Sequence, residues 1–358
     1  MADPHHHIRI EKLLLGQDSL DAPLQRAFSR YEARNLQYGE HWLKNLASHA
    51  LDENDQAIIY IARLGPDNFV ACPLKISSPH KRASSLCTFY TSSYSPIISS
   101  DTPKELLQAL FRYLARTERI STLTLAPMES GAPEFSLLRE ALSQSGWKGR
   151  HDFFCFGNWI HDIETRSYPS YLASRPSKLR NTLARKTKKF LADDRGSLEI
   201  IEGGDALESA IARYVTVYNN SWKHEEPYQD FIPELLRLSS DRGWLRLGIA
   251  SYDGQSVASQ IWLVCEGTAY IFKLAYHEDY KGLSPGTVLT AHMMQRVIEE
   301  DGIARIDYLS GDDAYKADWM SVRKEQYGLA AYNPRTPAGL ALLAGHTLKQ
   351  LAKKLRAG

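Results

Sequence analysis

The sequence predicts a mixed α/β fold made of two lobes, and three observations support this. The chain has 358 residues, whereas single domains usually contain about 100–200. Apolar residues make up 43% of the chain and charged residues 24%, which is the composition of a globular protein with enough apolar material for two cores. Segments with helical and β-type patterns alternate, and their order in the first half returns in the second. We therefore expect lobes over 1–160 and 161–335, each with a central sheet and flanking helices, followed by a helix over 336–358.

The first lobe begins with a helix. Apolar residues between Leu20 and Tyr31 recur at spacings of i, i+4, i+7, i+8 and i+11, which places them on one buried helical face. Two strand-like runs follow, and the residues Gly65-Pro66-Asp67-Asn68 between them predict a hairpin turn. The further elements expected in this lobe are strands at 57–64, 69–76, 121–125 and 148–159, and helices at 103–114, capped by Asp101 or Thr102, and at 133–145.

The second lobe repeats this order of elements after a basic segment at 160–195. Asp253-Gly254 joins two of its strands and is the strongest short hairpin signal in the chain. No strict sequence repeat accompanies the repeated order. The expected elements are helices at 204–222, 231–239 and 286–300, and strands at 244–252, 256–266, 268–276 and 304–308.

Charge and cysteine content exclude several classes of protein. Lys and Arg total 43 and Asp and Glu total 42, a net charge of +1, so the chain as a whole does not have the charge of a DNA-binding protein. The cysteines are far apart in sequence and form no CxxC pair, which argues against a structural zinc site and a disulfide framework. Free thiols are typical of a reducing cytoplasm. The four cysteines are Cys72, Cys87, Cys155 and Cys265.

The two ends of the chain leave alternatives open. The first residues lack the pattern of a secretory signal, and no stretch is apolar enough to cross a membrane, so we expect a cytoplasmic protein. His5, His6 and His7 could bind a metal, although a disordered end or added residues explain such a run more simply. The tail over 337–356 is helical in pattern, apolar early and basic late. It either lies on a membrane surface or packs on its own domain with its cations in solvent.

The most informative stretch is IFKLAYHEDYKGLSPGTVLTAHMMQRV. A strand ends near Tyr276, a turn follows over 281–286, and a helix begins with Thr287. Glycines allow a ligand to approach the backbone closely, and the free N–H groups at a helix start form an anion site suited to phosphate. Lys281 adds a positive charge. The alternative is an ordinary turn from strand to helix.

A second stretch, RIDYLSGDDAYKADWM, gathers polar groups at the end of a strand. Asp307 ends the strand, Gly311 makes a turn, and acids, a phenol and an amine follow within a few residues. Such groups can orient a nucleophile and exchange protons. The alternative is a capped helix in which Lys316 pairs with an acid at i+4. The polar residues after the turn are Asp312, Asp313, Tyr315 and Lys316.

Two further regions are candidates for substrate binding. The basic segment SRPSKLRNTLARKTKKF has the spacing of a helix with one cationic face, and its arginines, Arg180 and Arg185 among them, suit bidentate phosphate contacts. A solvated linker helix is the alternative. Trp222 and His224 lie in NNSWKHEEPY, where Trp222 could form a pocket wall and His224 could act as a base. A lone histidine near a helix end is more often incidental.

Together these stretches resemble the GNAT acyltransferase fold. The resemblance rests on a three-strand meander, a Lys-Gly-x-x-x-Gly turn into a helix, and a strand with a polar cluster. The segment SPGTVLTAHMMQRVIEEDGIARIDYLSGDDAYKADW is similar in sequence to the CelD/BcsL-type acetyltransferases, which are linked to cellulose and other exopolysaccharide synthesis. That branch is similar to the FemAB-type transferases, which carry two GNAT-like lobes. The resemblance covers about 171–333, whereas in the first lobe only the order of elements agrees.

The resemblance implies two tandem GNAT-like lobes, the first of them degenerate, and an acyltransferase site in the second. Acyl-CoA would be a co-substrate rather than a permanently bound cofactor, and no metal is implied. Lys281, Ser284 and Gly286 take the places of the turn that holds the coenzyme A pyrophosphate in GNAT enzymes, with Lys and Ser as departures from the family pattern. The residues implied to bind the donor are Leu274, Ala275, Tyr276, Lys281, Gly282, Ser284, Gly286 and Thr287.

The implied reaction is direct attack of an amine or hydroxyl acceptor on the donor carbonyl. The strand at 274–276 would help polarise that carbonyl. Asp307 or Asp312 would take or relay the proton of the acceptor, and Tyr315 would protonate the leaving group. Lys316 would neutralise phosphate or developing charge. Arg180, Arg185, Trp222 and His224 are the remaining residues expected to bind substrate.

Two rival functions remain open at the level of sequence. FemAB-type enzymes use an aminoacyl-tRNA as donor, so a transferase of that type is one alternative. A catalytically inactive GNAT-fold module that binds a nucleotide sugar or a partner protein is the other. The acceptor is expected to be small or linked to the cell envelope, and the sequence does not specify it further.

Overall fold

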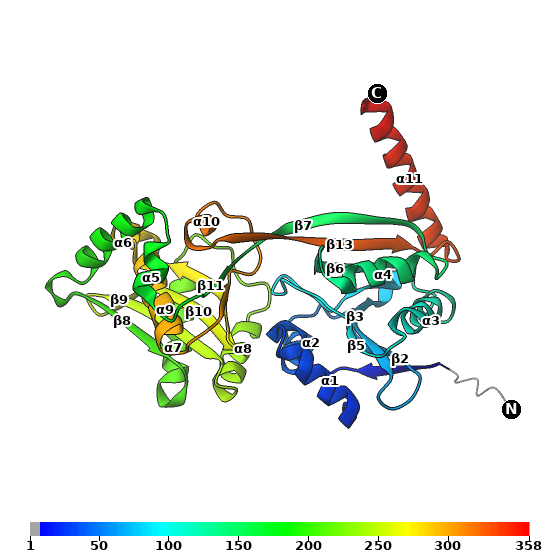
Figure 1. Cartoon of the computed structure of the whole chain (residues 1–358), viewed down its shortest axis with the longest axis horizontal. Coiled ribbons are helices and arrows are strands. Elements are labelled where there is room, and N and C mark those ends of the chain that lie inside the picture. The colour runs from blue at the N-terminus through cyan, green and yellow to red at the C-terminus, as the bar shows by residue number, and fades with distance from the viewer. Residues whose placement is uncertain (1–7, 358) are drawn as a thin grey trace. The chain divides into compact units, whose positions relative to one another are not determined.

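The structure is a computed structural model that describes residues 8–357, without the side chains of residues 193, 353, 354, 356 and 357. His5, His6 and His7 lie outside the described residues. The chain forms two compact units (Figure 1). Unit 1 contains the residues up to Phe156 and those from Glu325 onward, and unit 2 is Gly157–Lys324. Each unit has its own cluster of buried apolar side chains.

Unit 1 is a mixed sheet covered by helices. β1, β2, β3 and β4 pair antiparallel in that order, β4 pairs parallel with β6, and β6 pairs antiparallel with β13. The short β5 pairs with β3. The strands are β1 (Arg9–Leu14), β2 (Asp55–Arg63), β3 (Phe69–Ser77), β4 (Arg82–Ser85), β5 (Ile97–Ser99), β6 (Thr122–Glu129) and β13 (Val322–Tyr332).

The helices of unit 1 follow local sequence signals. Asp21 caps the first helix, because its side chain accepts a hydrogen bond from the N–H of Leu24 at 2.9 Å. Pro103 begins the third, where its missing N–H costs no helical hydrogen bond. The apolar face of that helix, which includes Leu110 and Phe111, is fully buried in the core of the unit. The helices are α1 (Ala22–Glu32), α2 (Glu40–His49), α3 (Pro103–Arg116), α4 (Pro133–Ser143) and α11 (Pro337–Ala357).

The strands of unit 2 are part of the same 13-stranded sheet as those of unit 1. β8, β9, β10 and β11 pair antiparallel in that order, and β11 pairs parallel with β12. β12 pairs antiparallel with the last residues of β7. Asp253 and Gly254, with φ of +50° and +76°, form the turn between β9 and β10, as a two-residue hairpin requires. The strands are the last residues of β7 (Lys148–Asp162), whose first part belongs to unit 1, and β8 (Gly196–Ile201), β9 (Leu245–Tyr252), β10 (Gln255–Cys265), β11 (Thr268–Tyr276) and β12 (Arg305–Asp307).

The helices of unit 2 cover both faces of this sheet. The helices are α5 (Tyr168–Ala173), α6 (Ser177–Phe190), α7 (Leu207–Asn219), α8 (Phe231–Asp241), α9 (Pro285–Glu299) and α10 (Lys316–Trp319). α9 packs across β9, β10 and β11 together with α5 and α6. α9 lies so close to β9 at Gly248 that a Cβ on this residue would be only 2.6 Å from the sulfur of Met293. α7 contacts the same three strands, and its buried side chains belong to a different apolar cluster from those of α9.

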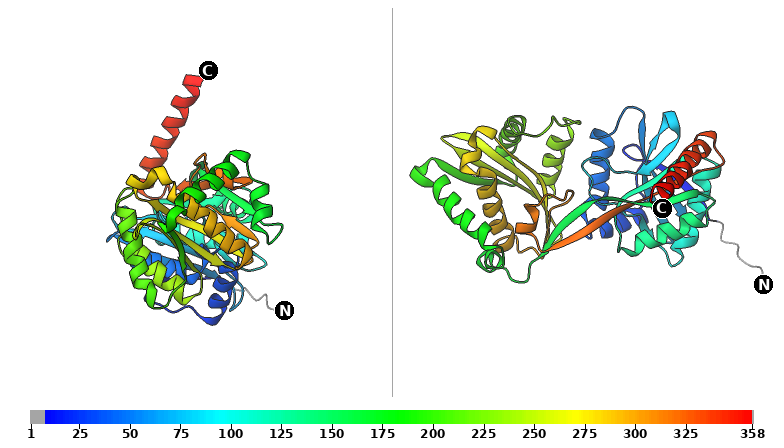
Figure 2. Two further views of the ribbon diagram at one scale, coloured as in Figure 1. Left: turned by 90° about the vertical axis from the view of Figure 1, so that its left-hand side faces the viewer. Right: turned by 90° about the horizontal axis from the view of Figure 1, so that it is seen from above.

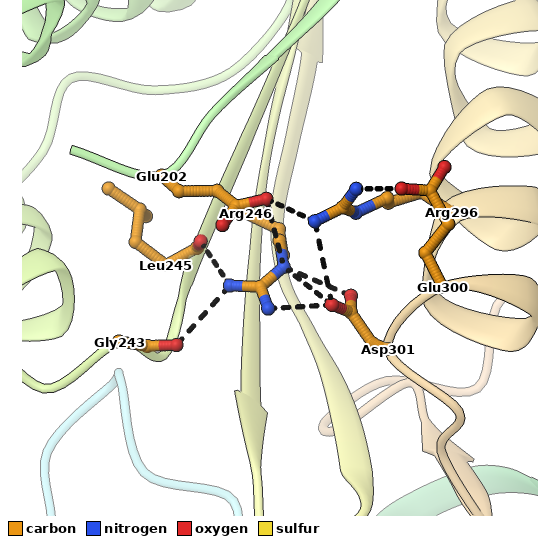
Figure 3. A network of polar contacts seen from close by, with 7 residues as sticks. All are labelled: Glu202, Gly243, Leu245, Arg246, Arg296, Glu300 and Asp301. Atoms are coloured by element: carbon orange, nitrogen blue, oxygen red, sulfur yellow. Dashed lines mark hydrogen bonds and ion pairs between the residues drawn. The ribbon is translucent and has the colours of Figure 1, made fainter.

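The far end of α9 is held by a network of charged groups (Figure 3). The Arg246 guanidinium donates to Asp301 just beyond the helix, with Nη2 2.6 Å from Oδ1, and to the carbonyl of Leu245 at 2.8 Å. Arg296 of α9 pairs with Glu202 and with Glu300. The side chains of Arg246 and Asp301 are only 11% and 7% exposed, so this pair is buried and fixes α9 relative to β9.

The two parallel strands of unit 2 pair over a short length. The ladder between β11 and β12 runs from Thr268 opposite Arg305 to Tyr270 opposite Asp307. β12 ends there, whereas β11 continues to Tyr276 alongside β10. Beyond Tyr270, β11 is therefore no longer paired with β12. The end of β11 and the start of α9 lie beyond that point.

The structure confirms the mixed α/β fold and differs in detail from the expected elements. The sequence analysis missed β1, α2, β8 and β13, because short or half-polar segments have weak periodicity. The expected second lobe ran to residue 335, but β13 pairs with β6 of unit 1, and its Leu329 and Ala331 lie in the core of that unit. The expected boundary near residue 160 is close to Gly157, where unit 2 begins.

Candidate functional site

The start of α9 has the geometry of an anion site. A turn of 3-10 helix over Glu278–Leu283 leads from β11 to Ser284, which has φ of +55° and ψ of +47°, and Pro285 is the first residue of α9. The first N–H groups of an α-helix lack helical acceptors. Because proline has no N–H, Gly286 and Thr287 are the residues that offer donors here. The first N–H of the helical ladder is that of Val288, which donates to the carbonyl of Ser284.

Two aromatic rings border this helix start. Trp222 and Tyr276 have ring centroids 4.4 Å apart, and Trp222 is 52% exposed. A Cβ at Gly286 would lie 3.4 Å from Cδ1 of Tyr276. Glycine at this position therefore keeps open the space between the Tyr276 ring and the helix start. The sequence analysis named Trp222 as a possible pocket wall without locating it, and the structure places its ring beside that of Tyr276 at the end of β11.

One cation of the basic helix reaches the turn. The Lys186 ammonium donates to the carbonyl of Gly282 at 2.9 Å. Lys281 is mainly exposed, and its ammonium is 3.8 Å from a carboxylate oxygen of Glu278. Lysine charge is therefore present at both sides of the turn. The sequence analysis noted Lys186 as part of the basic segment without assigning it to the site, because helical spacing alone does not say which cation faces a neighbouring turn.

The two arginines chosen from sequence are placed differently. Arg180 donates to the carbonyls of Ala173 and Arg175, at 2.6 and 3.1 Å, so its guanidinium stabilises the end of α5. Arg185 is exposed on α6. Arg175 is buried, and it donates to the carbonyl of Trp319 at 3.2 Å. Arg180 and Arg175 therefore bind main-chain carbonyls and stabilise the fold. A phosphate contact by Arg185 stays a prediction.

A chain of hydroxyl and amide groups connects the helix start to Tyr315. Gln260 Nε2 donates to the carbonyl of Gly286 and to Thr290 Oγ1, at 2.8 Å each. The Thr290 hydroxyl lies close enough to the Tyr308 phenol to lower the pKa of that phenol, and Tyr308 in turn lowers the pKa of the Tyr315 phenol. The rings of Tyr308 and Tyr315 meet edge to face, with centroids 5.9 Å apart. The two informative stretches of the sequence are thus joined by one polar network.

Tyr315 is the accessible end of this network. Its side chain is 45% exposed, whereas Tyr308 is buried. Burial of the phenol and the nearby Asp313 carboxylate raise the pKa of Tyr315 to about 12. Its hydroxyl therefore carries a proton throughout the neutral range and is available as a proton donor.

Lys316 holds the loop that precedes Tyr315. Its ammonium donates to the carbonyls of Ser310, Tyr308 and Gly311, at 2.6, 3.3 and 3.3 Å. The residue is only 4% exposed, and burial lowers the pKa of its ammonium. A cation committed to three carbonyls stabilises the loop, so the structure does not support the expected contact of Lys316 with phosphate.

The two candidate proton acceptors have structural partners as well. Asp307 accepts from Asn158 Nδ2 at 2.6 Å and from the N–H of Leu309 at 2.7 Å, and burial raises the pKa of its carboxyl group. Asp312 pairs with Arg323, which lowers the pKa of the Asp312 carboxyl group. Asp312 also accepts from Trp159 Nε1 at 2.9 Å. Neither acid caps a helix, because α10 begins without a side-chain cap. Lys316 pairs with Asp313 at i+3, with 3.7 Å between the charged atoms, and not with an acid at i+4. The capping interpretation was therefore wrong in its details, and a catalytic role for Asp307 or Asp312 stays a prediction.

Comparison with known proteins agrees with this geometry. Residues 177–317 match the sequence model of a family described as an acetyltransferase (GNAT) domain. Among curated proteins, none matches the sequence. The matched region begins with α6, contains the 281–286 turn and Tyr315, and ends within α10.

Solved structures extend the likeness to both units. A tandem GNAT protein from the clavulanic acid biosynthesis pathway matches with a TM-score of 0.55 at 12% identity, over 91% of this chain and 98% of that one. The fold is a tandem GNAT fold. FemX matches with a TM-score of 0.55 at 11% identity, over 89% and 96% of the two chains. The C-terminal domain (DUF2156) of a putative lysylphosphatidylglycerol synthetase from Agrobacterium fabrum matches with 0.51 at 15%, over 90% and 96%.

The second GNAT lobe contains a group of charges that the sequence analysis missed. Lys273 of β11 is 8% exposed, and its ammonium is 2.6 Å from a carboxylate oxygen of Glu226. Lys223 lies nearby, and its ammonium is 5.8 Å from the Trp222 ring centre. Burial and the adjacent Lys273 lower the pKa of Lys223 to about 8. The sequence did contain one signal for this charged group, the lysine within the apolar strand TAYIFKLAY, because a buried lysine needs an acidic partner.

The lysine group and the hydroxyl network share a neighbour. Asp313 raises the pKa of Lys223 and Lys316 lowers it. Asp313 also raises the pKa of Tyr315. The side chains of Lys223 and Tyr315 therefore lie near the same carboxylate. His224 is exposed, and its carbonyl accepts from the Tyr218 hydroxyl at 3.1 Å. A role of the His224 ring as a base stays a prediction, and Lys223 beside it is the better placed amine.

Proposed function

We propose that unit 2 transfers an acyl group from acyl-CoA to an amine or hydroxyl acceptor. The observation that carries this proposal is the network from Gly286 through Thr290 and Tyr308 to Tyr315. It connects the place where a donor phosphate would bind to a protonated phenol that can reach solvent. The match of residues 177–317 to a GNAT acetyltransferase domain supports the same reaction class.

The donor would bind across the end of β11 and the start of α9. The N–H groups of Gly286 and Thr287 would donate to its pyrophosphate, and Lys186 and Lys281 would add positive charge. The stretch Leu274, Ala275 and Tyr276 would lie along the acyl arm and polarise its carbonyl through main-chain groups. Trp222 would pack against the donor beside Tyr276.

The chemical step would be a direct displacement at the thioester carbon. The nitrogen or oxygen of the acceptor forms a bond to that carbon, and the carbon–sulfur bond breaks. Tyr315 would donate its proton to the leaving thiolate. Lys223, with a pKa of about 8, is partly neutral near neutral pH and would take the proton of the acceptor. The finer part of the proposal, an exopolysaccharide or cell-envelope acceptor, rests on the resemblance to CelD/BcsL-type proteins alone.

A binding panel tests the donor. Native mass spectrometry or calorimetry of the full chain would measure binding of acetyl-CoA, a long-chain acyl-CoA and a charged tRNA. We expect an acyl-CoA to bind, and to lose affinity when Lys186 is replaced by Gln. Binding of the charged tRNA alone would replace this proposal with an aminoacyl transferase of the FemAB type. Binding of none of the three would favour a non-catalytic GNAT module.

A further inference from the structure

α11 has an apolar stripe that faces away from its own unit. Leu340, Ala344, Leu348, Leu351 and Leu355 recur at spacings of four, four, three and four residues, so they line one face of the helix. All five are exposed, and the leucines are exposed by 54%, 67%, 52% and 84% in chain order. An apolar face on a helix of a folded protein is normally its buried face.

A different face of the helix contacts unit 1. The ring of His346 stacks on that of His151 in β7, with centroids 4.1 Å apart and an interplanar angle of 23°. It also meets the ring of Tyr332 in β13 at 5.5 Å. Leu343 lies over Gly149, where a Cβ would be 2.5 Å from Leu343 Cδ1. Leu343 and His346 are half-buried, so the packing of α11 does not cover the stripe.

The helix is attached at its beginning and extends outward from there. Gly339 is buried against the carbonyls of Asn333 and Ser121, from which a Cβ would be 2.2 and 2.7 Å away. From Thr347 to Ala352 the side chains are exposed, although the chain remains helical to Ala357. Figure 1 and the left view of Figure 2 show α11, in red, projecting away from the rest of unit 1.

The charges of this segment point to the kind of surface that covers the stripe. The sequence contains no acidic residue after Glu325, and α11 carries cations at Lys349, Lys353, Lys354 and Arg356. A second copy of the helix would bring cations toward cations with no acid in either helix to pair them. An anionic lipid surface, in contrast, accepts the leucines among its acyl chains and the cations at its headgroups.

We propose that α11 binds the surface of a membrane containing anionic lipids, with its leucine stripe in the interface. The helix lies on the bilayer rather than through it. None of the helices in the described part of the chain is long and apolar enough to cross a membrane. This proposal rests on α11 and not on the proposed acyltransfer, so either can fail without the other.

The test is co-sedimentation of the full chain with vesicles of phosphatidylcholine, with and without an equal amount of phosphatidylglycerol. We expect binding to the anionic vesicles to be at least about tenfold stronger. The double variant Leu348→Gln with Leu355→Gln should lower that binding by about tenfold or more, because two leucines no longer transfer from water. Lys349→Gln should lower it about fivefold and only on anionic vesicles.

The matched control is Leu342→Gln, which makes the same chemical change outside the stripe at an exposed position of the same helix. It should leave vesicle binding nearly unchanged. Circular dichroism of each variant would show that the fold and the helix persist. Failure of the wild-type chain to bind anionic vesicles would overturn the proposal. So would a dimer in light scattering that the double variant dissociates, since the stripe would then be an interface between copies of this chain.

Discussion

Tyr315 is the side chain on which the proposed acyltransfer most depends. Its phenol is the exposed end of a network that begins at the first turn of α9, and burial keeps its pKa at about 12. A thiolate leaving group needs a proton, and the Tyr315 phenol is protonated at neutral pH and can supply one. Tyr308 connects Tyr315 to the network, whereas burial and the Asp313 carboxylate raise the pKa of the Tyr315 phenol.

Replacing Tyr315 by Phe removes the proton and leaves the ring. We expect the turnover rate to fall by about 10²–10⁴-fold, the usual contribution of general acid catalysis, with donor affinity nearly unchanged. Steady-state kinetics and calorimetry would measure the two effects. Tyr168→Phe in α5 is the control, because it removes a hydroxyl outside the network. An equal loss of affinity and rate would instead make Tyr315 a binding residue.

Lys223 provides a prediction about pH. Its pKa of about 8 lies below the usual value of 10.5, so below pH 8 the folded protein retains an unfavourable half-buried charge. Between pH 8 and pH 10.5 the unfolded chain binds the proton of Lys223 more readily than the folded protein does. The free energy of unfolding therefore rises with pH in this range, and the unfavourable effect of the charge has disappeared by about pH 10.5. Lys223→Met should therefore raise the free energy of unfolding near pH 7 by on the order of 2 kcal/mol, and much less above pH 10.

Urea unfolding of the wild type and the variant at the two pH values would measure this difference. Lys281→Met is the control, because Lys281 is largely exposed and its replacement should have little effect at either pH. Equal stabilisation at both pH values would show that apolar burial, not the charge, explains the result.

At the scale of elements, α9 determines the geometry of the site. Its first turn offers the donors, its second contributes Thr290 to the network, and its far end is fixed by charged groups. The helix can lie close to the sheet because Gly248 leaves room for Met293. Changes at its two ends should therefore have different consequences.

Gly286→Val should weaken donor binding by at least about tenfold, which corresponds to about 1.4 kcal/mol. A Cβ at this position meets the Tyr276 ring at 3.4 Å, and the added methyl groups would cover the helix start. Calorimetry with acyl-CoA would measure the loss. Gly131→Ala is the matched control, because a Cβ there meets nothing within 4 Å and the residue lies outside unit 2. Unchanged affinity in a folded Gly286→Val protein would place the donor elsewhere.

Arg246→Met at the other end should destabilise the fold. It leaves the buried Asp301 carboxylate without its main partner (Figure 3), and breaking such a pair costs about 3–5 kcal/mol. Arg195→Met is the control, because its pair with Asp253 is half exposed on both sides and should be worth about 0–1 kcal/mol. Denaturant unfolding would compare them, and equal losses would contradict the importance of burial.

At the scale of the whole molecule, the chain consists of one GNAT-like unit inserted into another. Each has a separate apolar cluster, with Trp262 and Met293 in that of unit 2 and Phe111 in that of unit 1. All the residues of the proposed site lie within Gly157–Lys324. Unit 2 therefore contains both a core and a site on one continuous segment.

A chain of residues 157–324 alone should fold cooperatively and retain most of the affinity for acyl-CoA. Circular dichroism during urea unfolding and calorimetry would test the two expectations. The same segment with Tyr214 replaced by Asp, which places a charge in the core, is the unfolded control. A non-cooperative transition in the wild-type segment would show that unit 2 depends on the rest of the chain for its stability.

The sequence by itself determined the fold class and most elements. Helical periodicity located α1, α3, α7, α9 and α11, and turn residues located the hairpins, because these signals depend on neighbours in the chain. The strand–turn–helix at α9 was also predicted, since glycine and proline act locally. The family resemblance placed Tyr315, which the network connects to that turn.

Only the tertiary structure decided which polar side chains are available for chemistry. The sequence predicted Arg180 and Lys316 as binding residues, but their charged groups bind carbonyls that lie five to eight residues earlier in the chain. The path of the chain at these turns, which periodicity does not encode, brings those carbonyls within reach. Lys223 became a candidate because Lys273 and Glu226, about fifty residues apart in sequence, meet beside it. Ion pairing and burial depend on residues distant in the chain, and no local pattern encodes them. For the same reason, only the structure showed that the leucine stripe of α11 faces outward.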